Sequence, residues 1–237
     1  MLVNVMGAFG SGKSTLVNIL GEDLDAKKYL ENPYAIPILK DYYSGGKETR
    51  KKFGFPLQIA WLDERFSQLR EAVADDCAVM DSSLVADSIV YKVIHDRGET
   101  TDQEYNLYLK LLRHMLDSIS SEPKGHYPDL YVFLDISPEK EIEDIIGRGR
   151  EMETADPNLI EYYKSINNGF KNWADSYSEA PIVRIDRDLY DFESNDDDRN
   201  VVLDLIEQKL VDLGYLTNQD FQNIKDMRGW SQLCDNF

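Results

Sequence analysis

The sequence is short of cysteine, of histidine and of positive charge. Its two cysteines, Cys77 and Cys234, are too few for a disulfide framework and lack the spacing of metal ligands. Lysine and arginine together number 26 against 44 aspartates and glutamates, which gives a formal net charge of −18. Such an acidic chain is a poor partner for a nucleic-acid backbone or an anionic membrane surface, so we expect neither.

Long apolar runs and linkers are missing as well. No stretch stays apolar over the roughly 20 residues that a membrane-spanning helix needs. No internal repeat and no Pro/Ser/Gly-rich linker divides the 237 residues. A chain of this length can bury a sizeable core, and we expect one main domain.

A phosphate-binding motif, G-x-x-x-x-G-K-[ST], stands at residues 7–14. In this motif the backbone N–H groups cradle phosphates, the lysine reaches the outer phosphates and the hydroxyl can hold Mg²⁺. Residues 2–6 read as a buried strand, and a helix opening at residue 14 would aim its positive dipole end at the phosphate. The motif therefore predicts binding of a nucleoside triphosphate by Gly7, Ala8, Phe9, Gly10, Ser11, Gly12, Lys13, Ser14 and Thr15. Because the motif starts at residue 7, we expect no signal peptide and a cytoplasmic protein.

Strands and helices alternate along the rest of the chain, as in an α/β protein. The pattern predicts strands at 26–30, 77–80, 130–136 and 182–185. It predicts helices starting near Pro56 and Pro138, and others at 84–95, 102–119, 157–177 and 201–213. The unbroken apolar run at 130–136 is typical of a parallel-sheet strand. After Gly214 the sequence is polar and we expect irregular structure.

Acidic residues follow two of the expected strands. Glu31 comes after 26–30, at the edge where an open α/β sheet binds its ligand, although a solvated loop glutamate would look the same in the sequence. Asp81 comes after 77–80, an arrangement that resembles a Walker-B aspartate and can orient Mg²⁺ beside the phosphate loop.

Other candidate residues share helix faces or follow a helix end. Gln58, Trp61 and Arg65 fall on one face and could line a pocket for a flat heterocycle, or form an ordinary core-facing stripe. Asp87 and Tyr91 are four residues apart and also share a face. Two arginines at 148 and 150, set between glycines, favour a phosphate clamp over a basic helix end that complements its dipole.

Taken together, these stretches resemble the deoxynucleoside kinase family, especially its bacterial deoxyadenosine/deoxyguanosine kinase branch. The resemblance covers residues 1–213. It rests on 7–15, Glu31, Gln58 with Arg65, 81–83 with Asp87, 148–150 with Glu153, and the loop 186–199. It implies a P-loop kinase fold, with a parallel five-stranded sheet wrapped by helices and an arginine-containing lid at about 148–156. It also implies a dimer, and it leaves 214–237 as a tail of unknown role.

The resemblance assigns a role to each candidate residue. Glu31 matches the general base, and Tyr43 with Glu153 match the pair that holds the sugar 3′-hydroxyl. Gln58, Arg65 and Asp87 match contacts to the base edge, and Tyr91 matches the aromatic ring stacked on the base. Arg148 and Arg150 match lid arginines that act with Lys13 on the moving phosphoryl group. Ser14 and Asp81 would arrange Mg²⁺, and Asp81 would also border the acceptor.

One position departs from the family pattern. Where the family has Asp/Glu-Arg-Ser after the third strand, this chain has Asp81-Ser82-Ser83, so a guanidinium is missing. By analogy with other electrostatic donors, its loss could cost about 2–4 kcal/mol of transition-state stabilisation.

We expect an ATP- and Mg²⁺-dependent kinase that phosphorylates the 5′-hydroxyl of a purine deoxynucleoside in salvage. Two alternatives stay open. A kinase of nucleoside monophosphates or modified nucleosides would need a cation for the acceptor phosphate, and Ser82 removes the obvious one. A non-catalytic subunit in a heterodimer fits the missing arginine, but it has no need for Lys13, Glu31 and the lid arginines together.

Overall fold

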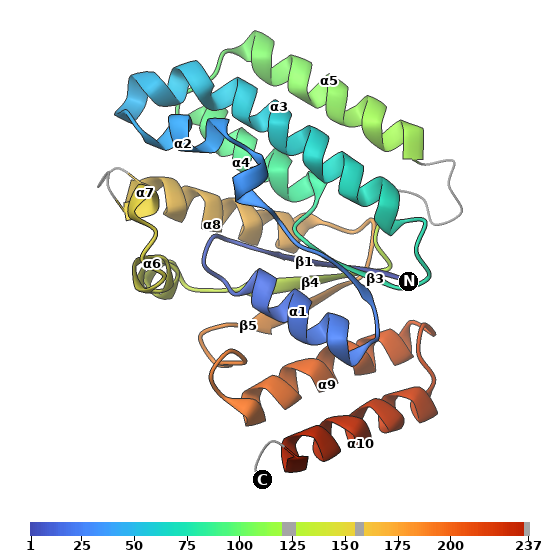
Figure 1. Cartoon of the computed structure of the whole chain (residues 1–237). Helices are drawn as coiled ribbons and strands as arrows, with labels where there is room; N and C mark the ends of the chain where they lie inside the picture. The colour runs from blue at the N-terminus through green and yellow to red at the C-terminus, as the bar shows by residue number, and fades with distance from the viewer. Residues whose placement is uncertain (120–126, 155–158, 235–237) are drawn as a thin grey trace.

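The computed structural model describes residues 1–119, 127–154 and 159–234 (Figure 1). In these residues five strands form one parallel sheet in the order β2-β3-β1-β4-β5. Their bounds are β1 (Leu2–Gly7), β2 (Lys27–Tyr29), β3 (Ala78–Asp81), β4 (Leu130–Asp135) and β5 (Ile182–Asp186). The expected five-stranded parallel sheet is confirmed.

Strand β1 lies at the centre of the sheet and sets where the carboxyl ends of the strands meet. Val3 pairs with Val79 of β3 on one side and with Leu130 of β4 on the other. All six residues of β1 are buried, as expected for a parallel strand covered on both faces. The phosphate loop after β1 therefore lies beside the ends of β3 and β4.

Helices cover both faces of the sheet, and Figure 1 shows α1, α9 and α10 on one side and α3, α4, α5 and α8 on the other. The side chains of β1 alternate between two apolar clusters, with Val3 and Val5 in one and Leu2 and Met6 in the other. The helices are α1 (Lys13–Asp23), α2 (Ile38–Tyr43), α3 (Gly46–Ala72), α4 (Leu84–Asp96), α5 (Asp102–Ile119), α6 (Pro138–Gly147), α7 (Glu151–Thr154), α8 (Leu159–Ser176), α9 (Asp196–Asp212) and α10 (Asn218–Cys234), with a 3₁₀ turn at Pro33–Ala35. None of the helices in the described ranges is both long enough and apolar enough to cross a membrane.

Helix α3 begins earlier than the sequence suggested. We expected a start near Pro56, but the helix starts at Gly46 and continues through the proline. A proline inside a helix removes one backbone hydrogen bond. Here the helix buries Arg50 and Gly54 before the proline and Leu57 and Gln58 after it, so tertiary packing outweighs the local cost.

The C-terminal tail is not irregular, as we expected, but forms helix α10 packed against α9. Its start is a capping box: the amide of Asp220 donates to Thr217 Oγ1 (3.1 Å), and the amide of Thr217 donates to Asp220 Oδ2 (2.9 Å). Helix α9 likewise starts at Asp196 rather than at 201. The Asn195 side chain accepts from the amides of Asp197 and Asp198 and fixes that start.

Candidate active site

A cavity of about 720 Å³ opens at the carboxyl edge of the sheet. This is within the usual size range of small-molecule sites. Most of the residues that the sequence singled out line it: Gly7, Phe9, Gly10, Ser11, Gly12, Lys13, Ser14, Thr15, Glu31, Tyr43, Gln58, Asp81, Asp87, Arg148, Arg150 and Glu153. Among the described residues, three candidates do not line the cavity: Ala8, Arg65 and Tyr91. All three are buried.

The phosphate loop has the backbone that its glycines permit. Gly10 and Gly12 have φ values of +73° and +90°, in the left-handed region that favours glycine. A Cβ on Gly12 would lie 2.4 Å from Glu193 Oε1 and 3.0 Å from the Phe192 ring, so Glu193 would have to move to admit a side chain. Lys13 Nζ donates to the Ala8 carbonyl oxygen at 2.8 Å. Helix α1 has no side-chain cap, which leaves its first-turn amides available to an anion.

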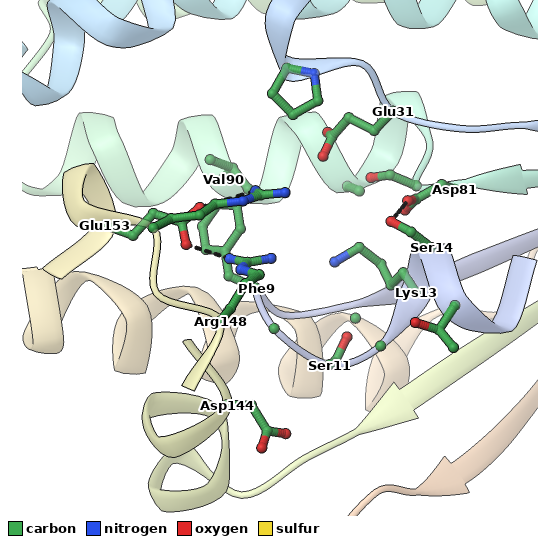
Figure 2. A pocket seen from close by; sticks show the side chains of 18 of the residues that line it. Phe9, Ser11, Lys13, Ser14, Glu31, Asp81, Val90, Asp144, Arg148 and Glu153 are labelled. Atoms are coloured by element: carbon green, nitrogen blue, oxygen red, sulfur yellow. Dashed lines mark hydrogen bonds and ion pairs between the residues drawn. The ribbon is translucent and has the colours of Figure 1, made fainter. Parts of the chain in front are cut away.

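Ser14 of α1 and Asp81 of β3 both line the cavity, and the Ser14 hydroxyl donates to Asp81 Oδ2 (Figure 2). The other carboxylate oxygen, Asp81 Oδ1, is buried and has no hydrogen-bond partner. Burial raises the pKa of Asp81, and Lys13 opposes the rise. Within the described ranges no three His, Cys, Asp or Glu side chains form a metal cluster. The pair suits Mg²⁺, which takes few protein ligands and fills its shell with phosphate oxygens and water.

Glu31 lies two residues after the end of β2 and pairs with a buried arginine. Arg65 Nη2 donates to Glu31 Oε1 at 2.8 Å, and Arg65 Nε lies 3.5 Å from Asp87 Oδ2. The Arg65 side chain is only 1% exposed. The two carboxylates line the cavity while the guanidinium stays behind them. Burial raises the pKa of Asp87 to about 7, and Arg65 opposes the rise.

Arg148 and Arg150, which the resemblance assigned to a lid, both contact one carboxylate. Arg148 Nη2 lies 2.5 Å from Glu153 Oε2, and Arg150 Nη1 lies 3.3 Å from Glu153 Oε1. Figure 2 shows Arg148 and Lys13 pointing into the same space from opposite sides, with Glu31 across from them. Residues 155 and 156 of the expected lid lie outside the described residues.

Tyr43 and Tyr91 end up in different surroundings. Tyr43, at the end of α2, lines the cavity, and burial followed by the nearby Tyr162 raises its pKa well above the usual range, so its hydroxyl stays protonated. Tyr91 is fully buried and packs on Tyr105 and Tyr108, with ring centroids 5.5 Å and 4.5 Å away. Its ring turns toward α5, although its backbone shares a helix face with Asp87.

Aromatic and polar residues that carried no assigned role also line the cavity. Trp61 belongs to the helix stripe, whereas Phe170 lies within the amphipathic helix α8, where the sequence gives no sign of a site. Arg187 follows the end of β5; its Nε donates to the Ser11 carbonyl oxygen at 2.9 Å, and its guanidinium lies 4.3 Å from the Phe192 ring centroid. The position of Arg187 just after a strand end was the one available signal.

Comparison with known proteins gives consistent results. The sequence profile of a family described as deoxynucleoside kinase matches residues 3–212. The chain is 35% identical to a deoxyguanosine kinase of Lactobacillus acidophilus over 91% of this chain and 93% of that protein. It is 34% identical to a deoxyguanosine kinase of Lactobacillus johnsonii over 90% and 94%. The fold matches a deoxyadenosine kinase from M. mycoides with bound dCTP, with a TM-score of 0.73 and 22% identity over 88% of this chain and all of that one.

Proposed function

The chain belongs to the deoxynucleoside kinase family, and we propose that it transfers the γ-phosphoryl group of ATP to the 5′-hydroxyl of a purine deoxynucleoside in nucleotide salvage. The observation that carries this proposal is the facing arrangement of Glu31 and Lys13 across a single cavity. Two relatives that are deoxyguanosine kinases support a purine acceptor. We further propose a homodimer that works in the cytoplasm.

The acceptor half of the cavity lies between α3, α4 and the end of β2. Glu31 is the general base that takes the proton of the 5′-hydroxyl as phosphorus is attacked. Tyr43 and Glu153 border the same half and hold the sugar 3′-hydroxyl. Gln58 and Asp87, whose side chains reach the cavity from α3 and α4, meet the polar edge of the base.

The donor half is built on the phosphate loop. Lys13 and the amides that begin α1 hold the phosphates of ATP, and phosphoryl transfer is then accelerated mainly by positioning and charge neutralisation. Arg148 and Arg150 leave Glu153 to neutralise charge on the moving group. Ser14 and Asp81 would hold Mg²⁺, which would neutralise further charge on the phosphates.

An assay with ATP, Mg²⁺ and each of the four deoxynucleosides tests the proposal, with the nucleoside monophosphates as controls. We expect turnover on deoxyguanosine or deoxyadenosine. Turnover on monophosphates alone would show that the acceptor group is a phosphate and not the 5′-hydroxyl. Bound ATP without turnover on any acceptor would favour the non-catalytic subunit.

Glu31→Gln tests the assigned base. Because general-base catalysis contributes about 10²- to 10⁴-fold, we expect kcat to fall by that factor while the deoxynucleoside still binds. Glu71→Gln, at an exposed glutamate of α3, is the matched control and should keep wild-type kcat. Wild-type turnover by Glu31→Gln would show that another group takes the proton.

A further inference from the structure

Arg65 lies behind the reacting space rather than in it. Its guanidinium contacts three acidic residues: Glu31 Oε1 at 2.8 Å, the Asp81 carbonyl oxygen at 2.8 Å and Asp87 Oδ2 at 3.5 Å. Each of these three acidic residues borders the cavity, whereas the Arg65 side chain does not reach it. A ligand in the cavity therefore meets Glu31 and Asp87, and meets Arg65 only through them.

The charge around this point is unbalanced without Arg65. Three carboxylates, Glu31, Asp81 and Asp87, surround the Arg65 guanidinium, and burial raises the pKa of Asp81 and Asp87. Among the ion pairs of the described residues, that with Arg65 is the only one that Glu31 makes. Ser82, at the end of the neighbouring strand β3, is uncharged and has a left-handed backbone with φ +71°.

The segment that carries Glu31 is also tied to α3 beside Arg65. Gln68, one turn further along, donates to the Leu30 carbonyl oxygen at 3.1 Å, and Arg65 Nη1 lies 3.4 Å from Gln68 Oε1. The backbone before Glu31 and the carboxylate of Glu31 are therefore both fixed by the same helix. A displacement of Arg65 would release the carboxylate while the backbone stays held.

We propose that Arg65 is a positioning residue that orients the general base Glu31 and the base-contacting Asp87 on one guanidinium, in place of the cation that position 82 lacks. The proposal rests on the proposed function and replaces the direct base-edge contact expected for Arg65. The same guanidinium then positions both the residue that contacts the nucleobase and the residue that accepts the proton. A bidentate guanidinium suits this task because it fixes the direction of each contact, which an ammonium does not.

Steady-state kinetics of Arg65→Gln test the proposal. We expect kcat to fall about 100-fold, KM for the deoxynucleoside to rise and KM for ATP to stay within about threefold. Loss of the cation should also raise the pKa of Asp87 above its value of about 7, because the Arg65 guanidinium opposes the rise that burial causes. Arg70→Gln, at an exposed arginine of the same helix, is the control and should change neither quantity.

A second-site variant separates positioning from simple structural support. Ser82→Arg in the Arg65→Gln background returns a guanidinium to the end of the strand next to β2, and we expect it to recover at least tenfold in kcat. Both residues at position 82 carry a Cβ, so the left-handed backbone strains them alike. If Arg65→Gln fails to fold, Arg65→Lys with and without Ser82→Arg gives the same comparison.

Three results would overturn the proposal: wild-type kcat in Arg65→Gln, a loss of kcat with an unchanged KM for the deoxynucleoside, or no recovery with Ser82→Arg. The titration of Asp87, followed by carboxyl ¹³C NMR and assigned with Asp87→Asn, gives a readout independent of turnover. If the wild-type chain phosphorylates no deoxynucleoside, the proposed function fails. The Arg65 arrangement is still judged by whether Arg65→Gln raises the Asp87 pKa, and an unchanged pKa rejects it.

Discussion

At the scale of single residues, two large aromatic rings help to line the cavity. Trp61 of α3 and Phe170 of α8 both line it, and both are otherwise buried. Tyr91, the ring that the sequence assigned to stacking on the base, instead packs on Tyr105 and Tyr108. We therefore predict that the ring stacked on the base comes from α8 rather than from α4.

Phe170→Leu should raise KM for the deoxynucleoside about two- to tenfold and change kcat little, because an aromatic pair contributes about 0.5–1.5 kcal/mol beyond its buried area. Tyr91→Leu is the comparison: it should lower the unfolding midpoint, since a buried ring is lost, and leave KM unchanged. Both constants come from initial rates at saturating ATP. The opposite pattern, with KM raised only by Tyr91→Leu, would return the stacking role to Tyr91.

Residues inside sequence motifs were predictable, and those placed by packing were not. The phosphate loop fixes its own backbone through Gly10 and Gly12, so Lys13 and Ser14 reach the cavity as the spacing predicted. Arg65 shares a helix face with Gln58, yet it is drawn behind the cavity by Glu31 and Asp87. Helical spacing fixes the direction of Cβ but not the direction of a long side chain.

At the scale of elements, helix α6 carries a buried acid below the phosphate loop. Glu141, in the first turn of α6, is fully buried, and Asn167 of α8 donates to its Oε2 at 2.8 Å. The same amide group also donates to the Ile136 carbonyl oxygen at 3.0 Å. Burial raises the pKa of Glu141 to about 7, and the bond from Asn167 opposes the rise. Helices α6 and α8 are thus joined through a group that ionises near neutral pH.

The raised pKa of Glu141 predicts a pH dependence of stability. The group contributes its full stability below its unfolded pKa of about 4.5 and loses it as pH rises through its folded pKa of about 7. Glutamine does not ionise, so Glu141→Gln is free of this loss. The free energy of unfolding of the variant, relative to that of the wild type, should therefore be about 3 kcal/mol more favourable at pH 8 than at pH 4. Urea unfolding at several pH values measures the difference.

Glu139→Gln, at an exposed glutamate of the same turn, serves as the control and should parallel wild type at every pH. If Glu141→Gln also parallels wild type, Glu141 is ionised in the folded protein at neutral pH and burial does not govern it.

The strands were easier to predict than the ends of the helices. Strands β3 and β4 are buried on both faces and therefore appear as short apolar runs. The start of α3 was mispredicted because proline is common in the first turn of a helix, and Pro56 was taken as that position. The helix continues through Pro56 because tertiary packing stabilises it on both sides. The start of α10 did have a local signal, the capping pair Thr217 and Asp220. The prediction of irregular structure missed it because it considered only the polarity of the segment.

At the scale of the whole molecule, α10 lies beyond the residues matched by the family profile, which end at 212. It is fixed by Arg228, which pairs with Asp23 at the end of α1 (3.0 Å) and with Asp204 (3.0 Å) and Glu207 (2.6 Å) of α9. Figure 1 shows α10 against α9, on the far side of α9 from the sheet. The helix therefore joins two elements of the same layer.

Arg228→Gln should lower the free energy of unfolding by about 3–5 kcal/mol, because it leaves buried carboxylates without their cation. Lys225→Gln removes a more exposed partner of Asp204 and should cost less than about 1 kcal/mol. Urea unfolding measures both, and kcat at 25 °C should stay at the wild-type value because neither side chain borders the cavity. Equal stability losses in the two variants would mean that α10 is not held by Arg228.

The position of β1 also has a consequence for how the chain is made. Residues 2–7 are synthesised before their partners in the sheet, residues 78–81 and 130–134. At about 5–20 residues per second, a ribosome needs on the order of ten seconds to supply the second partner. Both neighbours of β1, which fix the strand before the phosphate loop, are present only after residue 134 has been translated, so we expect ATP to assist only the later steps of folding.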